Sequence, residues 1–122
     1  MTYYRSTVVD VGPEAPAMAA AGVIIFFGEP LPEALAEVSV VHRPSQTLQG
    51  HAIGVGDIVT IGDGELEITS VGDIAAKNLD ELGHVVLYVN QPDQKLLPGG
   101  VNARGTLPVI EPGQIIEFRA RS

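Results

Sequence analysis

The chain has 122 residues, no cysteine and a formal net charge of −8 at pH 7. This length suits one domain, expected over residues 1–122, and a hydrophobic content of 45% suffices for a packed core. The lack of cysteine excludes disulfides and fits a reducing compartment. The acidic balance disfavours nucleic-acid binding, which relies on Lys and Arg, and favours association with basic protein surfaces.

The N-terminal region does not have the pattern of an export signal. The residues Tyr3–Arg5 interrupt any early apolar run. The later stretch Ala15–Phe27 lacks a basic leader, and Pro16 and Gly22 break it before it reaches the length of a bilayer span. The sequence therefore predicts a cytoplasmic protein without direct membrane insertion.

Three extended segments are expected in the first third of the chain. Tyr3–Val11 is rich in β-forming residues, and Val23–Phe27 is a continuous apolar run typical of a strand buried on both faces. Val38–Arg43 is the third segment, and Pro44 is expected to end it. Between the second and third segments, Pro30–Glu37 favours one or two helical turns.

A β-hairpin is the clearest local prediction. The segments Asp57–Ile61 and Glu65–Val71 alternate apolar and polar residues and flank the turn Gly62-Asp63-Gly64. Strand alternation places four apolar side chains on one face: Val59, Ile61, Leu66 and Ile68.

One convincing helix follows the hairpin. Asp73 is a suitable N-cap, and Ala75, Leu79 and Leu82 recur at helical spacing. Gly83 is a natural C-terminal stop. The sequence thus predicts one short helix between two extended regions.

The remainder of the chain is again mainly extended. His84–Val89 alternates as a strand, Asn90–Gly100 forms a Pro- and Gly-rich loop, and Gln114–Arg119 is the final strand. Short, closely spaced strands with one short helix predict an all-β fold, a small closed or nearly closed β-barrel.

Three histidines are the residues with ordinary pKa values near neutrality. His42 lies at the expected end of a strand, where it is either a phosphoryl acceptor or a partly exposed residue without a role. His84 follows the helix stop, where it either holds phosphoryl oxygens in its protonated form or caps the last helix carbonyls. His51 lies in a predicted loop, and no chemical role is expected for it.

A metal site is a competing use of the histidines, as in a metal-dependent sugar isomerase or a cupin-like protein. However, the spacing of His42, His51 and His84 matches no close ligand pair. The chain also lacks a dinucleotide fingerprint, a phosphate loop and a hydrolase elbow. We therefore expect no metal and no cofactor.

One segment resembles a known family. It has the form T-x-V-G-x-x-A-x-x-N-L-x-x-L-G-H, carried by Thr69, Val71, Gly72, Ala75, Asn78, Leu79, Leu82, Gly83 and His84. This pattern is similar to the central signature of the glucitol/sorbitol-specific IIA family of the phosphotransferase system. Leu97–Val101 resembles the family's Pro-Gly turn and the strand after it, and Pro112–Phe118 resembles its C-terminal strand. The resemblance covers nearly the whole chain.

The resemblance implies a small β-barrel that carries a phosphoryl group on a histidine. Family members accept it from the histidine phosphocarrier protein and pass it to the IIB part of the hexitol permease (IIB/IIC). The family's phosphorylated histidine follows a short apolar strand, a place that His42 occupies after Val40-Val41. The motif match at His84 implies a neighbour that orients or stabilises the phosphoryl group. Members often carry a second histidine soon after the first, whereas this chain has Arg43-Pro44-Ser45.

Two main hypotheses describe the whole chain, and the metal-dependent sugar isomerase or cupin-like protein is a further rival that predicts tightly bound metal. The first is a phosphohistidine carrier in sorbitol uptake, with His42 as nucleophile and His84 beside it. The second is a non-catalytic binding or regulatory module on the same barrel, since a fold does not determine a function. A homodimer is plausible in either case because of the excess of apolar residues.

Overall fold

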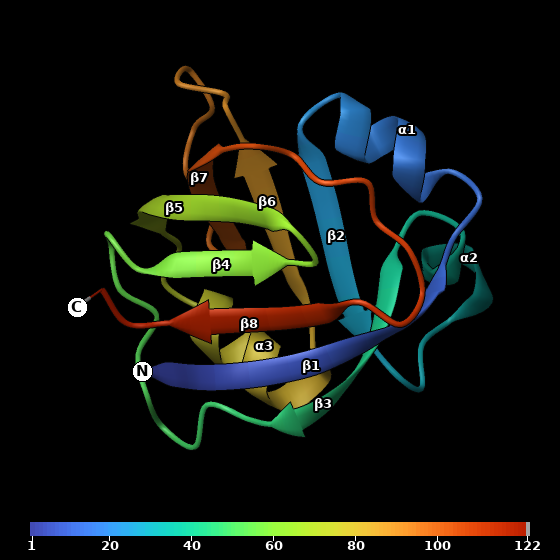
Figure 1. The fold of residues 1–122 in the computed structure, drawn as a ribbon, viewed down its shortest axis with the longest axis horizontal. Coiled ribbons are helices and arrows are strands. Elements are labelled where there is room, and N and C mark those ends of the chain that lie inside the picture. Colours follow the sequence, from blue (N-terminus) through green and yellow to red (C-terminus); the bar gives the residue numbers. More distant parts are fainter. Residues whose placement is uncertain (122) are drawn as a thin grey trace.

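The computed structural model describes residues 1–121, and eight strands in it form a closed barrel. Neighbouring strands follow the order β1-β3-β2-β6-β7-β5-β4-β8, and β8 pairs with β1 to close the ring (Figure 1). The strands are β1 (Thr2–Val11), β2 (Val23–Gly28), β3 (Val40–Gln46), β4 (Ile58–Ile61), β5 (Gly64–Val71), β6 (Val85–Val89), β7 (Gly100–Gly105) and β8 (Ile115–Arg119). The predicted all-β barrel is confirmed, and it is fully closed.

Two of the strand pairs are parallel, β2 with β3 and β6 with β7, and the remaining pairs are antiparallel. Closure leaves no unpaired sheet edge, so each strand has a hydrogen-bonded neighbour on both sides. The long strand β1 spans the front of the barrel in Figure 1 and joins β3 to β8.

The core lies inside the barrel and follows strand alternation. The β4–β5 hairpin confirms the sequence prediction, because Val59, Ile61, Leu66 and Ile68 are all buried in the core cluster. The segment around β2 differs from its prediction. Its inner residues are buried, but Val23, Ile25 and Phe27 are only half-buried, so the strand is not fully covered on both faces.

In the described residues three short helices connect the strands, whereas the sequence predicted one helix and one or two further turns. They are α1 (Ala15–Ala20), α2 (Glu33–Ala36) and α3 (Ala75–Leu82). Helix α2 lies within the turns predicted over 30–37. Helix α1 was not predicted, because its six residues are too few for a periodic signal and Pro16 reads as a breaker. Proline is tolerated there because it occupies the first turn.

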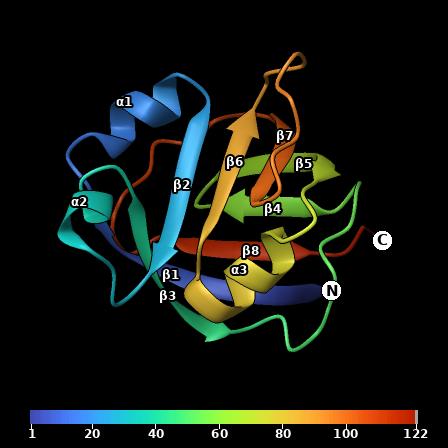
Figure 2. The same ribbon diagram turned by 180° about the vertical axis from the view of Figure 1, so that it is seen from behind.

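Helix α3 lies in front of the barrel in Figure 2, next to the start of β6. Ala75 and Leu79 bury its inner face in the core. The predicted N-cap at Asp73 is wrong: Ile74 occupies that position, without a side-chain cap, and its backbone N–H donates to the carbonyl of Pro98. The predicted stop at Gly83 is confirmed, with a left-handed φ of 65°.

Strand β3 extends beyond its predicted end. It runs through Pro44 to Gln46, although proline lacks the N–H that a sheet ladder uses. Pro44 lies opposite Ser6, where the pairing of β1 with β3 shifts register, and such an irregularity accommodates the missing donor. Beyond it, the Gln46 side-chain amide donates to the carbonyl of Thr2, at 3.1 Å, and keeps the strand attached.

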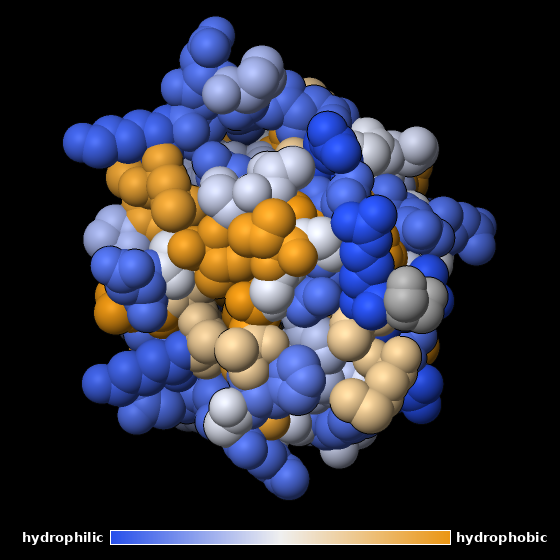
Figure 3. Space-filling view, turned by 90° about the vertical axis from the view of Figure 1, so that its left-hand side faces the viewer, coloured by the Kyte–Doolittle hydropathy of each residue, from blue (hydrophilic) through white to orange (hydrophobic). Residues whose placement is uncertain are grey.

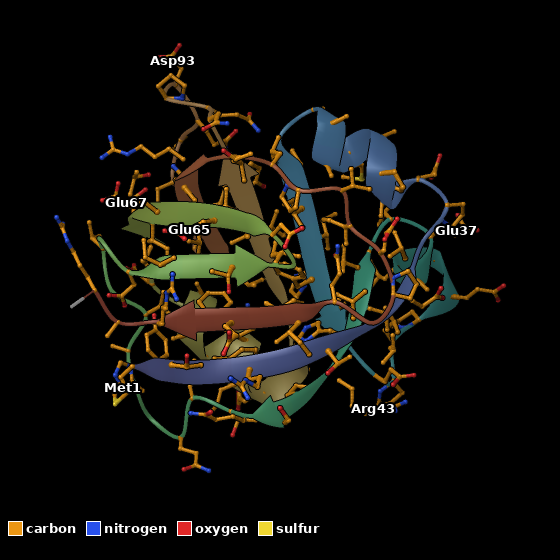
Figure 4. All side chains as sticks on the ribbon, in the orientation of Figure 1. Met1, Glu37, Arg43, Glu65, Glu67 and Asp93 are labelled. Carbon is orange, nitrogen blue, oxygen red and sulfur yellow. The ribbon has the colours of Figure 1, made fainter. Side chains whose placement is uncertain are left out.

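The surface carries several ion pairs between neighbouring strands. Arg104 pairs with Glu67 at 2.9 Å and Arg119 with Glu65 at 3.3 Å, and both glutamates project from β5 in Figure 4. The face on the left of Figure 1 combines a central apolar area with hydrophilic surroundings (Figure 3).

Within residues 1–121, no helix is long and apolar enough to cross a bilayer.

Candidate functional site

His42 is the third residue of β3, and its imidazole points into the barrel. Only 1% of the residue is exposed. The expectation of a partly exposed histidine at a strand end is therefore wrong, for two reasons. The strand continues for four more residues, and alternation turns His42 to the same inner side as Val40. The next residue, Arg43, points outward and pairs with Glu29 at 2.8 Å (Figure 4).

Both ring nitrogens of His42 have a hydrogen-bond partner. The Nδ1 atom lies 2.5 Å from the Ser6 hydroxyl, and Nε2 lies 2.6 Å from the Gly83 carbonyl oxygen. A carbonyl oxygen only accepts, so Nε2 carries the hydrogen in this arrangement. The Nδ1 lone pair then accepts from the Ser6 hydroxyl. The imidazole is held in one orientation and one tautomer.

Burial lowers the pKa of His42 from its ordinary value of 6.5, because the charged ring loses its hydration. The hydrogen bond to Gly83 opposes this effect, since it favours a protonated nitrogen, but burial is the larger cause. His42 is therefore neutral at neutral pH. A neutral imidazole retains one nitrogen lone pair, which is the requirement for a nucleophile.

The turn between α3 and β6 covers Nε2 of His42. Gly83 and Gly28 approach so closely that a Cβ placed on Gly83 would lie 2.8 Å from the Gly28 backbone and 3.2 Å from His42 Nε2. Gly28 also lies opposite His42 in the pairing of β2 with β3. Two glycines thus allow the turn to seal the ring from solvent.

His84 follows Gly83 on this turn and is half-buried. Its Nδ1 lies 3.1 Å from the Phe26 carbonyl oxygen, so Nδ1 carries a hydrogen, and its ring packs on Phe27 with centroids 4.6 Å apart. The side chain does not cap α3. The backbone N–H of His84 caps the helix instead, because it donates to the carbonyl of Asn78. Within residues 1–121, no hydrogen bond engages Nε2 of His84.

The structure brings His42 against Gly83, the residue directly before His84, whereas the His84 ring itself contacts Phe26 and Phe27. Tyr4 and Phe26 pack edge-on against the His42 ring. Among residues 1–121 the buried Tyr4 hydroxyl has no hydrogen-bond partner, and burial raises the pKa of Tyr4 well above the ordinary range. Ser6 was missed by sequence reasoning, because a serine within a strand pattern carries no signal until its partner across the barrel is known.

His51 lies apart from this site. Its ring stacks on Tyr3 at 4.1 Å between centroids, and its Nδ1 lies 2.7 Å from the carbonyl of Ala52. In the part of the chain that the structure describes, no three His, Asp or Glu side chains gather as they would around a metal ion. The three histidines therefore do not form a common cluster.

Comparison with known proteins places the chain in a family. The model of the PTS system glucitol/sorbitol-specific IIA component matches residues 3–117. The chain belongs to this family. The PTS glucitol/sorbitol-specific EIIA components of Shigella flexneri and Escherichia coli (strain K12) are each 31% identical to it over 118 residues. Each alignment covers 96% of this chain and 94% of the relative.

A solved structure of a PTS system IIA component, from Enterococcus faecalis V583, shares the fold of this glucitol/sorbitol-type IIA chain. The TM-score is 0.83 at 27% sequence identity, over 95% of this chain and 99% of the other. The family resemblance predicted from the motif around Gly83-His84 is thus confirmed. Membership of a IIA family implies a phosphotransferase carrier role and interaction with other components of the system.

Proposed function

We propose that this chain is a phosphohistidine carrier that acts between two proteins in the cytoplasm during sorbitol uptake. It accepts a phosphoryl group on His42 from the histidine phosphocarrier protein and passes it to the IIB component of the hexitol permease. The observation that carries the proposal is the orientation of His42, a neutral imidazole held at both nitrogens beside the Gly83-His84 motif of the family.

Of the two ring nitrogens, Nε2 is the acceptor that we propose. Nδ1 faces Ser6, which lies within strand β1 of the barrel wall. Nε2 faces only a turn, at the end of a helix of eight residues. A turn moves more readily than a wall strand that pairs on both sides. A phosphoryl group on Nε2 and the Gly83 oxygen 2.6 Å from it exclude each other, so transfer requires the turn to open.

We propose that His84 lies next to the phosphoryl group once the turn opens, because it directly follows Gly83, whose carbonyl contacts His42. Because Nδ1 of His84 donates to Phe26, its Nε2 is the nitrogen left for a phosphoryl oxygen. A protonated His84 would donate from Nε2, and a charge-assisted hydrogen bond of this kind stabilises an anionic group. Phosphoryl transfer depends mainly on such positioning and charge stabilisation.

The charge of the chain supports its use as a protein-binding carrier. A formal net charge of −8 attracts partners with basic surfaces and steers their encounter. A carrier that contacts a donor and then an acceptor depends on encounters of this kind.

The test is mass spectrometry after incubation with phosphoenolpyruvate and the two general proteins of the phosphotransferase system. We expect an acid-labile phosphoryl group on the peptide that contains His42. The group should be absent from His42→Gln and present in His51→Gln, the matched control outside the site. His84→Gln should still accept the group, but more slowly.

Two results would contradict the proposal in different ways. A phosphoryl group on His84, whose Nε2 makes no hydrogen bond to the residues that the structure describes, would keep the carrier role and change the nucleophile. Absence of any phosphoryl group, while another IIA protein is modified in the same mixture, would favour the non-catalytic binding module.

A further inference from the structure

The Ser6 hydroxyl is placed for a role in phosphoryl transfer. Ser6 is fully buried, and its Oγ lies 2.5 Å from Nδ1 of His42. The two residues are not directly opposed, because Ser6 pairs with Pro44 and Val8 pairs with His42. They meet diagonally across the inner face of the β1–β3 pair. In residues 1–121 this is the one side-chain hydrogen bond that the Ser6 hydroxyl makes.

The tautomer that the Gly83 contact requires is the wrong one for attack by Nε2. The Gly83 carbonyl holds a hydrogen on Nε2, so the lone pair of the ring is on Nδ1 and is occupied by the Ser6 O–H. For Nε2 to attack, the hydrogen must be on Nδ1 instead. The group next to Nδ1 must then accept a hydrogen bond where it previously donated one.

We propose that Ser6 is a positioning residue that reverses its hydrogen bond with His42 during transfer. In the resting protein its O–H donates to Nδ1. When the Gly83 turn opens, the ring takes the tautomer with hydrogen on Nδ1, and Nδ1–H donates to Oγ. This inference rests on the proposed carrier function and specifies how its nucleophile is prepared.

The transfer step balances with this arrangement. The lone pair of His42 Nε2 forms a bond to phosphorus while the P–N bond of the donor's phosphohistidine breaks. The donor ring, protonated on its other nitrogen, leaves as a neutral imidazole. The positive ring charge passes with the phosphoryl group to His42, whose Nδ1–H remains bonded to Ser6 Oγ. No proton is gained or lost overall.

A hydroxyl suits this position because it both donates and accepts. A carboxylate would only accept and would hold the hydrogen on Nδ1 permanently, whereas alanine would leave Nδ1 without a partner in a buried site. Burial strengthens the hydrogen bond and makes its loss costly.

The experiment compares Ser6→Ala with Ser6→Thr, which keeps the hydroxyl, and with Ser39→Ala as control. Ser39 is also fully buried, but its hydroxyl has no hydrogen-bond partner within residues 1–121. The readouts are the rate of phosphorylation at His42 by the phosphorylated histidine phosphocarrier protein and the ¹⁵N chemical shifts of the His42 ring. Loss of one buried hydrogen bond in the transition state slows transfer about tenfold.

We expect Ser6→Ala to be phosphorylated about tenfold more slowly than the unchanged protein. The phosphorylation rates of Ser6→Thr and Ser39→Ala should be close to that of the unchanged protein. In the unchanged protein, the ¹⁵N spectrum should show hydrogen on Nε2 before transfer and on Nδ1 after it, and this measurement needs no variant to fold. Hydrogen on Nδ1 before transfer would overturn the proposal. A folded Ser6→Ala protein that is phosphorylated at the normal rate would also overturn the proposal. This result would leave the carrier function unaffected. Absence of phosphorylation on His42 in the unchanged protein would overturn both.

Discussion

The Gly83 carbonyl oxygen accepts a hydrogen bond from Nε2 of His42 across 2.6 Å, so the end of helix α3 is joined to the inner side of strand β3. Both residues are buried. The contact links a residue of the family motif to the histidine that we propose as the acceptor. It also makes the stability of the fold depend on the protonation and packing of this histidine.

The first prediction concerns the pH dependence of stability. Burial lowers the pKa of His42 below 6.5, so the folded protein resists a proton that the unfolded chain accepts. Above pH 6.5 both states are neutral at His42 and its contribution to stability is complete. As the pH falls below 6.5, the unfolding free energy decreases by up to about 1.4 kcal/mol per pH unit, until the lowered pKa is reached.

Urea denaturation at a series of pH values measures this effect. His42→Gln removes the titrating group, so its unfolding free energy should decline less steeply over that range. Equal slopes for the unchanged protein and His42→Gln would contradict the prediction.

The second prediction concerns the glycine that covers His42. Gly83→Ala adds a Cβ in a left-handed conformation and against the Gly28 backbone, and we expect a loss of about 3 kcal/mol in unfolding free energy. Gly50 is the matched control, because it has a φ of +86° with nothing within 4 Å of an added Cβ. Gly50→Ala should lose only about 1 kcal/mol. Thermal denaturation of both variants checks this, and similar losses would show that the turn does not pack on β2.

The third prediction concerns two buried tyrosines on β1. The Tyr4 hydroxyl has no hydrogen-bond partner in the described part of the chain, whereas the Tyr3 hydroxyl donates to Asp57 at 2.7 Å. Tyr4→Phe removes an unsatisfied polar group, so we expect no loss of stability and a gain of up to about 1 kcal/mol. Tyr3→Phe should lose about 1–2 kcal/mol. Chemical denaturation distinguishes them, and a large loss for Tyr4→Phe would mean that its hydroxyl has a partner in solution.

The fourth prediction concerns Asp57, whose carboxylate joins three parts of the chain. It accepts from the Tyr3 hydroxyl at 2.7 Å, from the Gly54 N–H at 2.8 Å and from the Arg121 N–H at 3.2 Å. Asp57→Ala leaves the part-buried Tyr3 and Gly54 donors without this acceptor and should cost about 3 kcal/mol of unfolding free energy. Asp93→Ala, in the exposed loop at the top of Figure 4, should change it little. Equal effects of the two variants in urea denaturation would disprove the role of Asp57.

Several local features of this protein followed from the sequence by itself. The hairpin through Gly62-Asp63 followed because alternation and turn chemistry act within a few residues. The stop of α3 at Gly83 followed because a left-handed residue favours glycine. The family followed from the motif that ends at His84. Each of these signals is read from neighbours in the chain.

The surroundings of His42 were decided only by the tertiary structure. Its partners Ser6 and Gly83 lie 36 and 41 residues away in the chain. Which side chains face the barrel interior together depends on strand register and closure, and the register of β1 against β3 shifts on both sides of the Ser6–Val8 segment. A sequence pattern does not contain such a shift. The sequence alone therefore indicated which histidine to consider, and the closed barrel determined that it is buried, neutral and held at both nitrogens.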